Sequence, residues 1–230
     1  MGREAPVIAR PDPSDARRPG ILVADATPLS LLADIPGGLD WLFAPGARIW
    51  LTDIIMDEVR RNPGEGQDQR IEHRAEIADW IDRNQRRIRR VETRIGQRYA
   101  ADMQAWESAM DVWRKAGLPS EKAPPRPDWS NLGDRSIWFG ISSANAAIAG
   151  GEAVIVLADD ADVRAAVEAK GRQQKKVAID LMGTQTFLEW LVEDFRVPGA
   201  DTAWQTIYEA RSGKVATFED GADPVYIRVP

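Results

Sequence analysis

The stretch AVIVLADDAD, residues 153–162, decides the fold class of this chain. It is a short apolar run with β-branched residues that ends abruptly in acid, which is typical of a buried parallel strand meeting the loop at its carboxyl end. ILVAD at 21–25 and RIWLTD at 48–53 repeat the pattern. Helical patterns separate these runs, so the sequence predicts a three-layer α/β/α fold with a central parallel sheet.

Six acidic residues stand where the predicted strands end or where the following helices begin: Asp25, Glu58, Asp134, Asp159, Asp160 and Asp162. Ligands of open α/β sheets bind at the carboxyl ends of the strands, so acids far apart in the sequence can meet there. Clustered carboxylates repel each other unless a cation holds them together, and the set therefore predicts a divalent-metal site. Taken singly, each acid is better explained as a helix cap or turn residue. Their joint placement favours the metal site.

Residues from about 68 to 116 carry a different pattern. Apolar side chains recur there at helical spacing, which predicts a long helical arm, either one bent helix or two helices packed as a hairpin. A proline-rich linker over 117–131 follows. Five arginines would share one stripe of the arm: Arg83, Arg87, Arg90, Arg94 and Arg98. Such a stripe suits the phosphates of RNA, while the alternatives are a solvated face or an interface with an acidic partner.

Composition limits the classes of protein that remain. The 230 residues suit one domain over 21–196, with a flexible leader over 1–20 and a C-terminal appendage over 197–230 that holds a helix and a hairpin. There is no cysteine and a single histidine, His73, so thiolate chemistry and a Cys/His zinc site are excluded. The net charge of −6 leaves room only for a local basic surface. We expect no membrane span and a cytoplasmic protein.

Four short motifs carry the acids in a fixed order. They are ILVADATPLSLL with Asp25, LTDIIMDEVRR with Glu58, LGDRSIWFGISSA with Asp134, and VIVLADDADVR with three aspartates. This order, in this strand and helix context, resembles the PIN-domain nucleases, a family that includes the VapC-type toxins. The resemblance covers about 21–191, apart from the arm, which is longer than in the compact toxins.

The resemblance implies a role for the matched acids. Asp25 and Asp134 would be the primary metal ligands. Asp160 and Asp162 match the fourth motif better than Asp159, so either of them would complete the metal shell. The ion would be magnesium, or manganese in its place, because both prefer hard oxygen ligands.

Further residues would act beside the metal. Glu58 would bind the ion or position the attacking water, and Thr27 would hydrogen-bond Asp25 or a phosphate oxygen. Three arginines of the arm are the expected substrate contacts: Arg87, Arg90 and Arg94.

The function that the resemblance implies is metal-dependent cleavage of RNA by a toxin-like endoribonuclease. Its expected partners are the RNA substrate, an antitoxin or immunity protein and, because PIN toxins are commonly dimers, a second copy of the chain. Two alternatives stay open. One is a PIN-like binding module without catalysis that acts through the arm, and the other is a nuclease that cuts DNA.

Overall fold

A six-stranded sheet forms the centre of the computed structural model, which describes residues 18–60, 73–128, 132–173, 179–211 and 227–229. Its strands lie in the order β3-β2-β1-β4-β5-β6. In chain order they are β1 (Arg18–Ala24), β2 (Arg48–Thr52), β3 (Ile88–Val91), β4 (Glu152–Leu157), β5 (Ile179–Met182) and β6 (Ile227–Val229). Strands β1 to β5 are parallel, and β6 pairs antiparallel with β5 at one edge.

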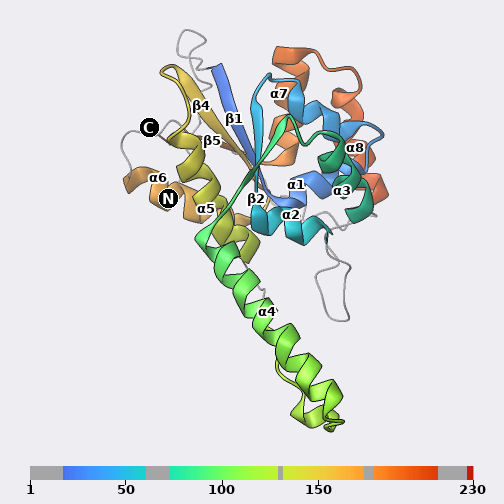
Figure 1. The fold of residues 1–230 in the computed structure, drawn as a ribbon. Helices are drawn as coiled ribbons and strands as arrows, with labels where there is room; N and C mark the ends of the chain where they lie inside the picture. The colour runs from blue at the N-terminus through green and yellow to red at the C-terminus, as the bar shows by residue number, and fades with distance from the viewer. Residues whose placement is uncertain (1–17, 61–72, 129–131, 174–178, 212–226, 230) are drawn as a thin grey trace, which may run out of the picture.

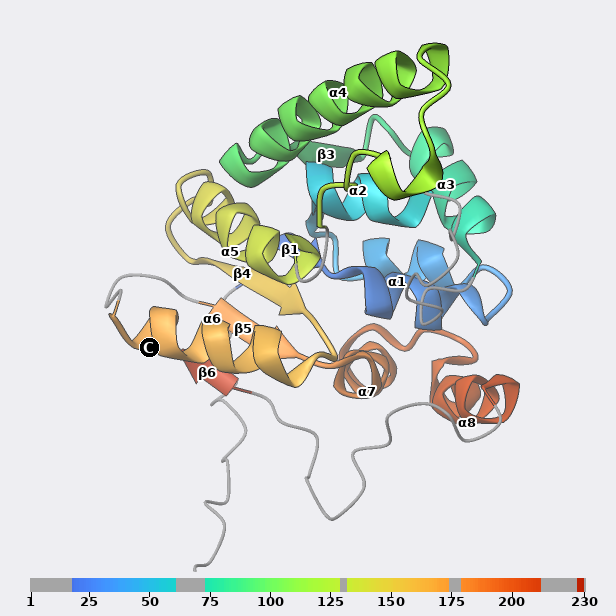
Figure 2. The ribbon, with the colours of Figure 1, turned by 90° about the horizontal axis from the view of Figure 1, so that it is seen from below.

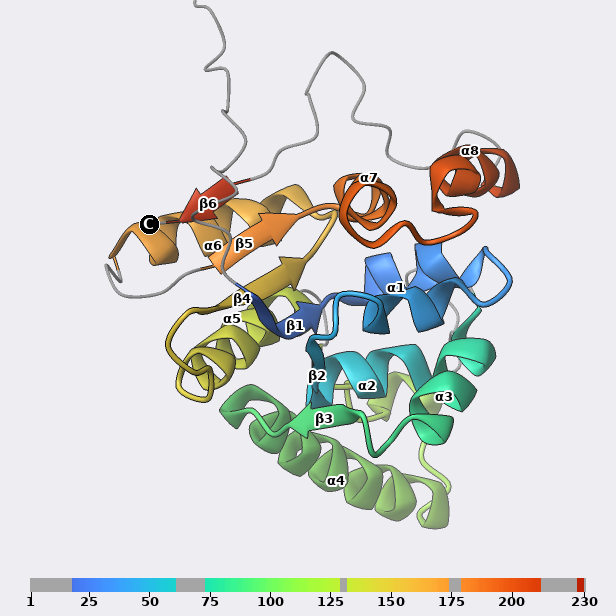
Figure 3. The ribbon, with the colours of Figure 1, turned by 90° about the horizontal axis from the view of Figure 1, so that it is seen from above.

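Helices cover both faces of the sheet, which confirms the predicted three-layer α/β/α arrangement (Figure 3). The helices are α1 (Ala26–Ala33), α2 (Asp53–Arg60), α3 (Arg74–Arg83), α4 (Arg94–Lys115), α5 (Leu132–Asn145), α6 (Ala161–Gln173), α7 (Thr184–Phe195) and α8 (Ala200–Ala210). Two short 3₁₀ turns accompany them, η2 (Gly38–Phe43) and η3 (Ser120–Lys122). Helices α5 and α6 lie on one face, and α1, α2, α3 and α7 lie on the other, with α8 packed on α7.

The apolar runs of the sequence form the central strands because both of their faces are covered. Ile21, Leu22 and Val23 of β1 are fully buried. Helix α5 comes especially close to the sheet at Gly140, where an added Cβ would lie 3.1 Å from Val23 Cγ1. A side chain at Gly140 would therefore require the neighbouring methyl groups of Val23 and Thr52 to shift by a few tenths of an ångström.

The predicted continuous helical arm is wrong in its first half. Residues 74–83 form α3, the chain then enters the sheet as β3, and only α4 continues as a long helix. Ile88 and Val91 are buried against the sheet, and this apolar pair with its β-branched side chains extends the sheet beside β2. The five arginines of the predicted stripe therefore do not share one helix, and residues 68–72 lie outside the described residues.

Helix α4 projects far from the body of the molecule (Figure 1). The chain that follows it runs back along the helix, and the indole N–H groups of Trp106 and Trp113 donate to the carbonyls of Pro124 and Pro119, at 3.0 and 3.1 Å. The proline-rich linker is thus the return half of the arm.

The two ends of the chain agree only in part with the sequence-based expectations. Strand β1 begins at Arg18, inside the expected leader, and residues 1–17 lie outside the described residues. The expected C-terminal helix is present as α8. Most of the expected hairpin lies outside the described residues, and its last strand, β6, pairs with β5. None of the described helices is both long enough and apolar enough to span a bilayer.

A candidate carboxylate site at the edge of the sheet

Four acidic residues from four different elements approach the carboxyl ends of β1 and β4. Asp25 directly follows β1, and Asp159 follows β4 after one residue. Glu58 lies in the second turn of α2, and Asp134 lies in the first turn of α5. Seen from below, the ends of these two strands lie between α1, α2 and α5 (Figure 2). This edge is where open α/β sheets bind ligands.

Asp25 is the buried centre of this group. Its backbone N–H donates to the carbonyl of Leu157 at 2.9 Å, which fixes it beside β4, and its side chain is only 4% exposed. Burial is the main reason why the pKa of the Asp25 carboxyl is raised to about 8; the backbone N–H of Ala26 opposes this rise, and the negative charges of Asp134, Glu58 and Asp159 add to it. Asp25 is therefore a protonated carboxylic acid at neutral pH while no cation is present.

Glu58 and Asp134 are brought together by a glycine. A Cβ placed on Gly133 would lie 2.6 Å from Glu58 Oε2, so the carboxylate of Glu58 occupies the space that any other side chain at this position would fill. Gly133 directly precedes Asp134 in the first turn of α5. Because Gly133 has no side chain, the carboxylate of Glu58 on α2 can approach the first turn of α5, which carries Asp134.

A buried pair of hydroxyls fixes this turn of α5 to the sheet. Ser136 Oγ donates to the carbonyl of Gly133 at 2.7 Å and lies 2.6 Å from Thr52 Oγ1. Because the Ser136 proton is used on Gly133, Thr52 must donate to Ser136, while Thr52 Oγ1 accepts from the N–H of Ile55 at 3.3 Å. The position of Asp134 is therefore set by β2 through hydrogen bonds that are shielded from water.

Asp159 is oriented by the first residue of α7. The backbone N–H of Thr184 donates to Asp159 Oδ1 at 2.8 Å, and its hydroxyl donates to Oδ2 at 2.6 Å. Burial raises the pKa of Asp159, and the two bonds from Thr184 and the positive charge of Arg164 oppose that shift. The carboxyl group of Asp159 is thus held in a defined direction, and its charged form raises the pKa of Asp25.

Asp160 and Asp162 have different surroundings. Asp160 Oδ1 accepts from the backbone N–H groups of Asp162 and Val163, at 2.7 and 3.3 Å, which makes Asp160 the cap of α6. Asp162 is exposed in the first turn of that helix. These contacts favour Asp159 as the third carboxylate of the site, in contrast to the sequence-based preference for Asp160 or Asp162.

The oxygen donors of this edge suit a hard divalent cation in their chemistry. Within the described ranges, no group of three or more Asp, Glu or His side chains is already arranged to hold an ion. The mutual repulsion that raises the pKa of Asp25 is nevertheless what a cation would relieve, and Asp25, Glu58, Asp134 and Asp159 are the residues that would hold it.

The expected substrate contacts lie on different elements. Arg90 in β3 is paired with Glu92 at 2.7 Å and with Asp57 at 3.5 Å, so its charge is largely offset. Arg87 precedes β3, and Arg94 is the exposed first residue of α4. Thr27 is the second residue of α1, two positions after Asp25, and its expected hydrogen bond stays a prediction.

Sequence reasoning overlooked three residues that shape the site. Thr184 carried no functional expectation, although it orients Asp159. Gly133 and Ser136 carried no functional expectation, although they position Glu58 and Asp134. The one usable signal was the glycine directly before Asp134, because a glycine inside a helix turn often marks a close approach.

Comparisons with known proteins add no family to these observations. No protein-family model matches the chain. No curated protein matches it either.

Proposed function

We propose that this chain is a metal-dependent phosphodiesterase of the PIN-nuclease type that hydrolyses RNA. The observation that supports it best is the burial of Asp25 among Asp134, Glu58 and Asp159, which raises its pKa to about 8. A carboxylic acid placed against three other carboxylates costs stability in the metal-free chain, and such a cost is typical of functional sites. Four motifs in PIN-like order supply these residues, which adds to the proposal.

In this proposal each side chain has a defined task. Asp25, Asp134 and Asp159 would hold the cation, for which Asp25 would have to be deprotonated. Glu58, which lies over Gly133, orients the attacking water. Magnesium, or manganese in its place, supplies the Lewis acidity that lowers the pKa of water and offsets negative charge on the scissile phosphate. The hydroxyls of Thr184 and Ser136 keep two of the carboxylates in place.

Cleavage of a labelled single-stranded RNA in magnesium tests the proposal. We expect cleavage by the native chain, none in EDTA, and none by the variant Asp25→Asn with Asp134→Asn. Asp159→Asn and Asp160→Asn form a matched pair, because only the first removes a carboxylate that acts on Asp25. Full activity in the double variant would end the assignment. A single-stranded DNA of the same sequence decides between RNA and DNA as substrate.

A binding module without catalysis is the second candidate. It is favoured by the finding that, among the described residues, the acids do not already form a finished metal site. This candidate predicts an intact fold that takes up neither Mg²⁺ nor Mn²⁺ and that acts through the projecting arm (Figure 1). An antitoxin or immunity protein and a second copy of the chain are proposed partners in both cases. Sedimentation of the purified chain tests the second copy.

A further inference from the structure

Positive charge is concentrated in one short segment of this acidic chain. Residues 83–98 contain seven arginines and a single acid, Glu92, whereas the whole chain carries a net charge of −6. Arg90 is neutralised by Glu92 and Asp57. The other six arginines are exposed and form what we name the arginine edge: Arg83, Arg86, Arg87, Arg89, Arg94 and Arg98.

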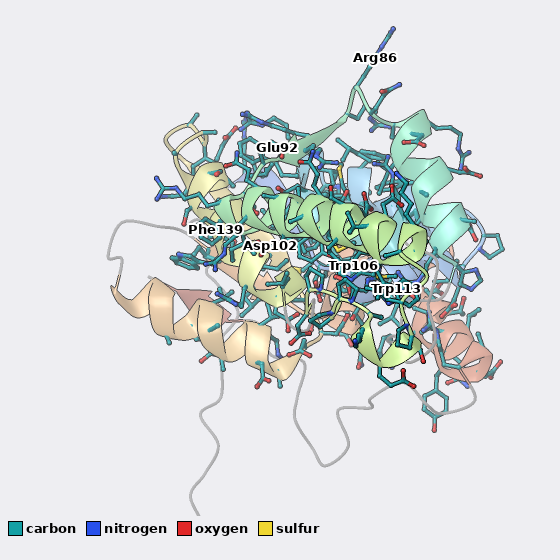
Figure 4. The ribbon with its side chains drawn as sticks, turned by 60° about the horizontal axis from the view of Figure 1, so that its bottom comes forward. Arg86, Glu92, Asp102, Trp106, Trp113 and Phe139 are labelled. Atoms are coloured by element: carbon teal, nitrogen blue, oxygen red, sulfur yellow. The ribbon has the colours of Figure 1, made fainter. Side chains whose placement is uncertain are left out.

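The arginine edge follows the outermost strand of the sheet toward the carboxylate site. It begins at the turn before β3, where Arg86 points away from the body (Figure 4), and continues into the first turns of α4. Strand β3 is parallel to β2, so its carboxyl end lies at the same edge of the sheet as Asp25. The base of α4 contacts α2 and α5, the helices that carry Glu58 and Asp134.

Two arginines of this edge are held in place by aromatic rings. The guanidinium carbon of Arg87 lies 3.5 Å from the centre of the Phe43 ring, and that of Arg89 lies 4.3 Å from the centre of the Trp50 ring. Stacking fixes the plane of a guanidinium and leaves its N–H groups in that plane free to bind an anion, at a low cost in side-chain entropy. Among the described residues, neither arginine forms a salt bridge.

The side chains of the arginine edge suit a phosphate backbone better than a protein surface. The apolar residues of β3, Ile88 and Val91, are buried, so the exposed surface around the arginine edge lacks the apolar centre of a typical protein interface. Planar guanidinium groups match phosphate oxygens in pairs. Strand β3 and one turn of α4 together span roughly 20 Å, which is enough for about three or four phosphates of an extended single strand.

We propose that the arginine edge binds the sugar–phosphate backbone of a single-stranded nucleic acid and guides it into the carboxylate site. One part of this inference rests on the proposed function: that the bound nucleic acid runs toward the carboxylate site, where it would be cut. It replaces the predicted helical stripe: Arg86 is added because it is exposed, Arg89 because it is stacked on Trp50, and Arg90 is removed because it is paired.

The test is the binding of a fluorescein-labelled single-stranded RNA of about 20 nucleotides, measured by anisotropy in EDTA between 50 and 200 mM salt. In the variant Arg87→Ala with Arg89→Ala, we expect affinity at 50 mM salt to fall about tenfold or more. We also expect the slope of log affinity against log salt to become shallower by about 1.4, since two phosphate contacts are lost. The matched control is Lys115→Ala with Lys122→Ala, which removes the same formal charge from exposed positions at the far end of the arm and should change affinity less than about twofold.

Two further measurements separate the outcomes. The variant Arg87→Lys with Arg89→Lys keeps the charge but loses the stacked plane, and we expect intermediate affinity. Equal affinity and slope in the native chain and the Arg87→Ala, Arg89→Ala variant would overturn the proposal. The proposal would also be overturned if a poly-glutamate peptide displaced the labelled RNA more strongly than unlabelled RNA does, since this result identifies an acidic protein partner instead. Binding is measured in EDTA, where no cleavage is expected, so failure of cleavage and failure of the arginine edge are distinguishable.

Discussion

Asp25 and Asp53 each follow a buried parallel strand, but the two strand ends have opposite surroundings. Asp53 is 2% exposed, and its carboxylate accepts from the N–H of Ile54 at 2.9 Å and from the hydroxyl and N–H of Thr93 at 2.8 and 3.0 Å. Asp25 is buried to a similar degree, yet it faces three other carboxylates. Asp53 links the end of β2 to the start of α4, whereas Asp25 weakens the metal-free fold. Burial alone does not distinguish a structural aspartate from a functional one. The two are distinguished by the hydrogen bonds that each carboxyl group accepts.

The largest expected effect is on catalysis. Asp25→Asn should lower the rate of RNA cleavage in magnesium by about 10³-fold, because it removes a central ligand of the proposed cation. Asp53→Asn should lower it by less than about tenfold at a temperature where that variant is folded. Single-turnover cleavage assays measure both. Equal losses in the two variants would remove the distinction between the two strand ends.

The next effect is on stability, where Asp53 is expected to matter more than Asp25. Asp53→Ala should lower the free energy of unfolding by about 3 kcal/mol, because it leaves buried donors on Thr93 without their acceptor. Asp25→Asn should leave the metal-free stability unchanged or raise it. Urea denaturation in EDTA measures both changes. Gly96→Ala provides a second probe of the same contact, since an added Cβ would lie 2.0 Å from Asp53 Oδ2 and should also destabilise the fold.

A third effect, of similar size, depends on pH. The pKa of Asp25 rises from 3.8 to about 8 on folding, so the folded chain holds a proton that the unfolded chain releases between these values. Ionisation therefore favours the unfolded chain, and this residue costs more stability as pH rises from about 4 to 8. We expect the stability advantage of Asp25→Asn over the native chain to grow from pH 5 to pH 8 in EDTA. A constant difference across this range would contradict the raised pKa.

The smallest expected effect concerns Thr184. Thr184→Val keeps the shape of the side chain but removes the hydroxyl that donates to Asp159. We expect a loss of about 1 kcal/mol in stability and a several-fold loss in cleavage rate, with Thr184→Ser restoring most of the rate. Denaturation and cleavage assays on the two variants provide the measurement. If Thr184→Val cleaved at the native rate, the orientation of Asp159 would have no part in catalysis.

The sequence was sufficient for the layers of the fold and for the strand ends at which the candidate acids lie. The apolar runs of β1, β2 and β4 end in acid or polar residues where the structure ends the strands, so the placement of Asp25 could be predicted. Sequence reasoning failed at β3, because its arginines and its two apolar residues, Ile88 and Val91, also fit a helical repeat. Only pairing with the distant β2 makes this segment a strand.

The choice among the three aspartates after β4 was beyond local sequence. Asp159 and Asp160 are neighbours with identical side chains, and both suit a turn that leads into a helix. Their roles are separated by Thr184, which lies far along the chain and orients Asp159, whereas the first turn of α6 uses Asp160 as its cap. Tertiary contacts of this kind are not encoded in the spacing of a motif.

Calorimetric titration of the native chain with Mn²⁺ at pH 7 tests the central claim most directly. We expect one ion per chain and the release of nearly one proton, seen as a dependence of the binding heat on buffer ionisation, because Asp25 must lose its proton. Asp53→Asn should bind in the same way, and Asp25→Asn should bind at least tenfold more weakly and release no proton. A native chain that takes up no ion, or an Asp25→Asn variant that binds it unchanged, would contradict the claim that these carboxylates share a cation.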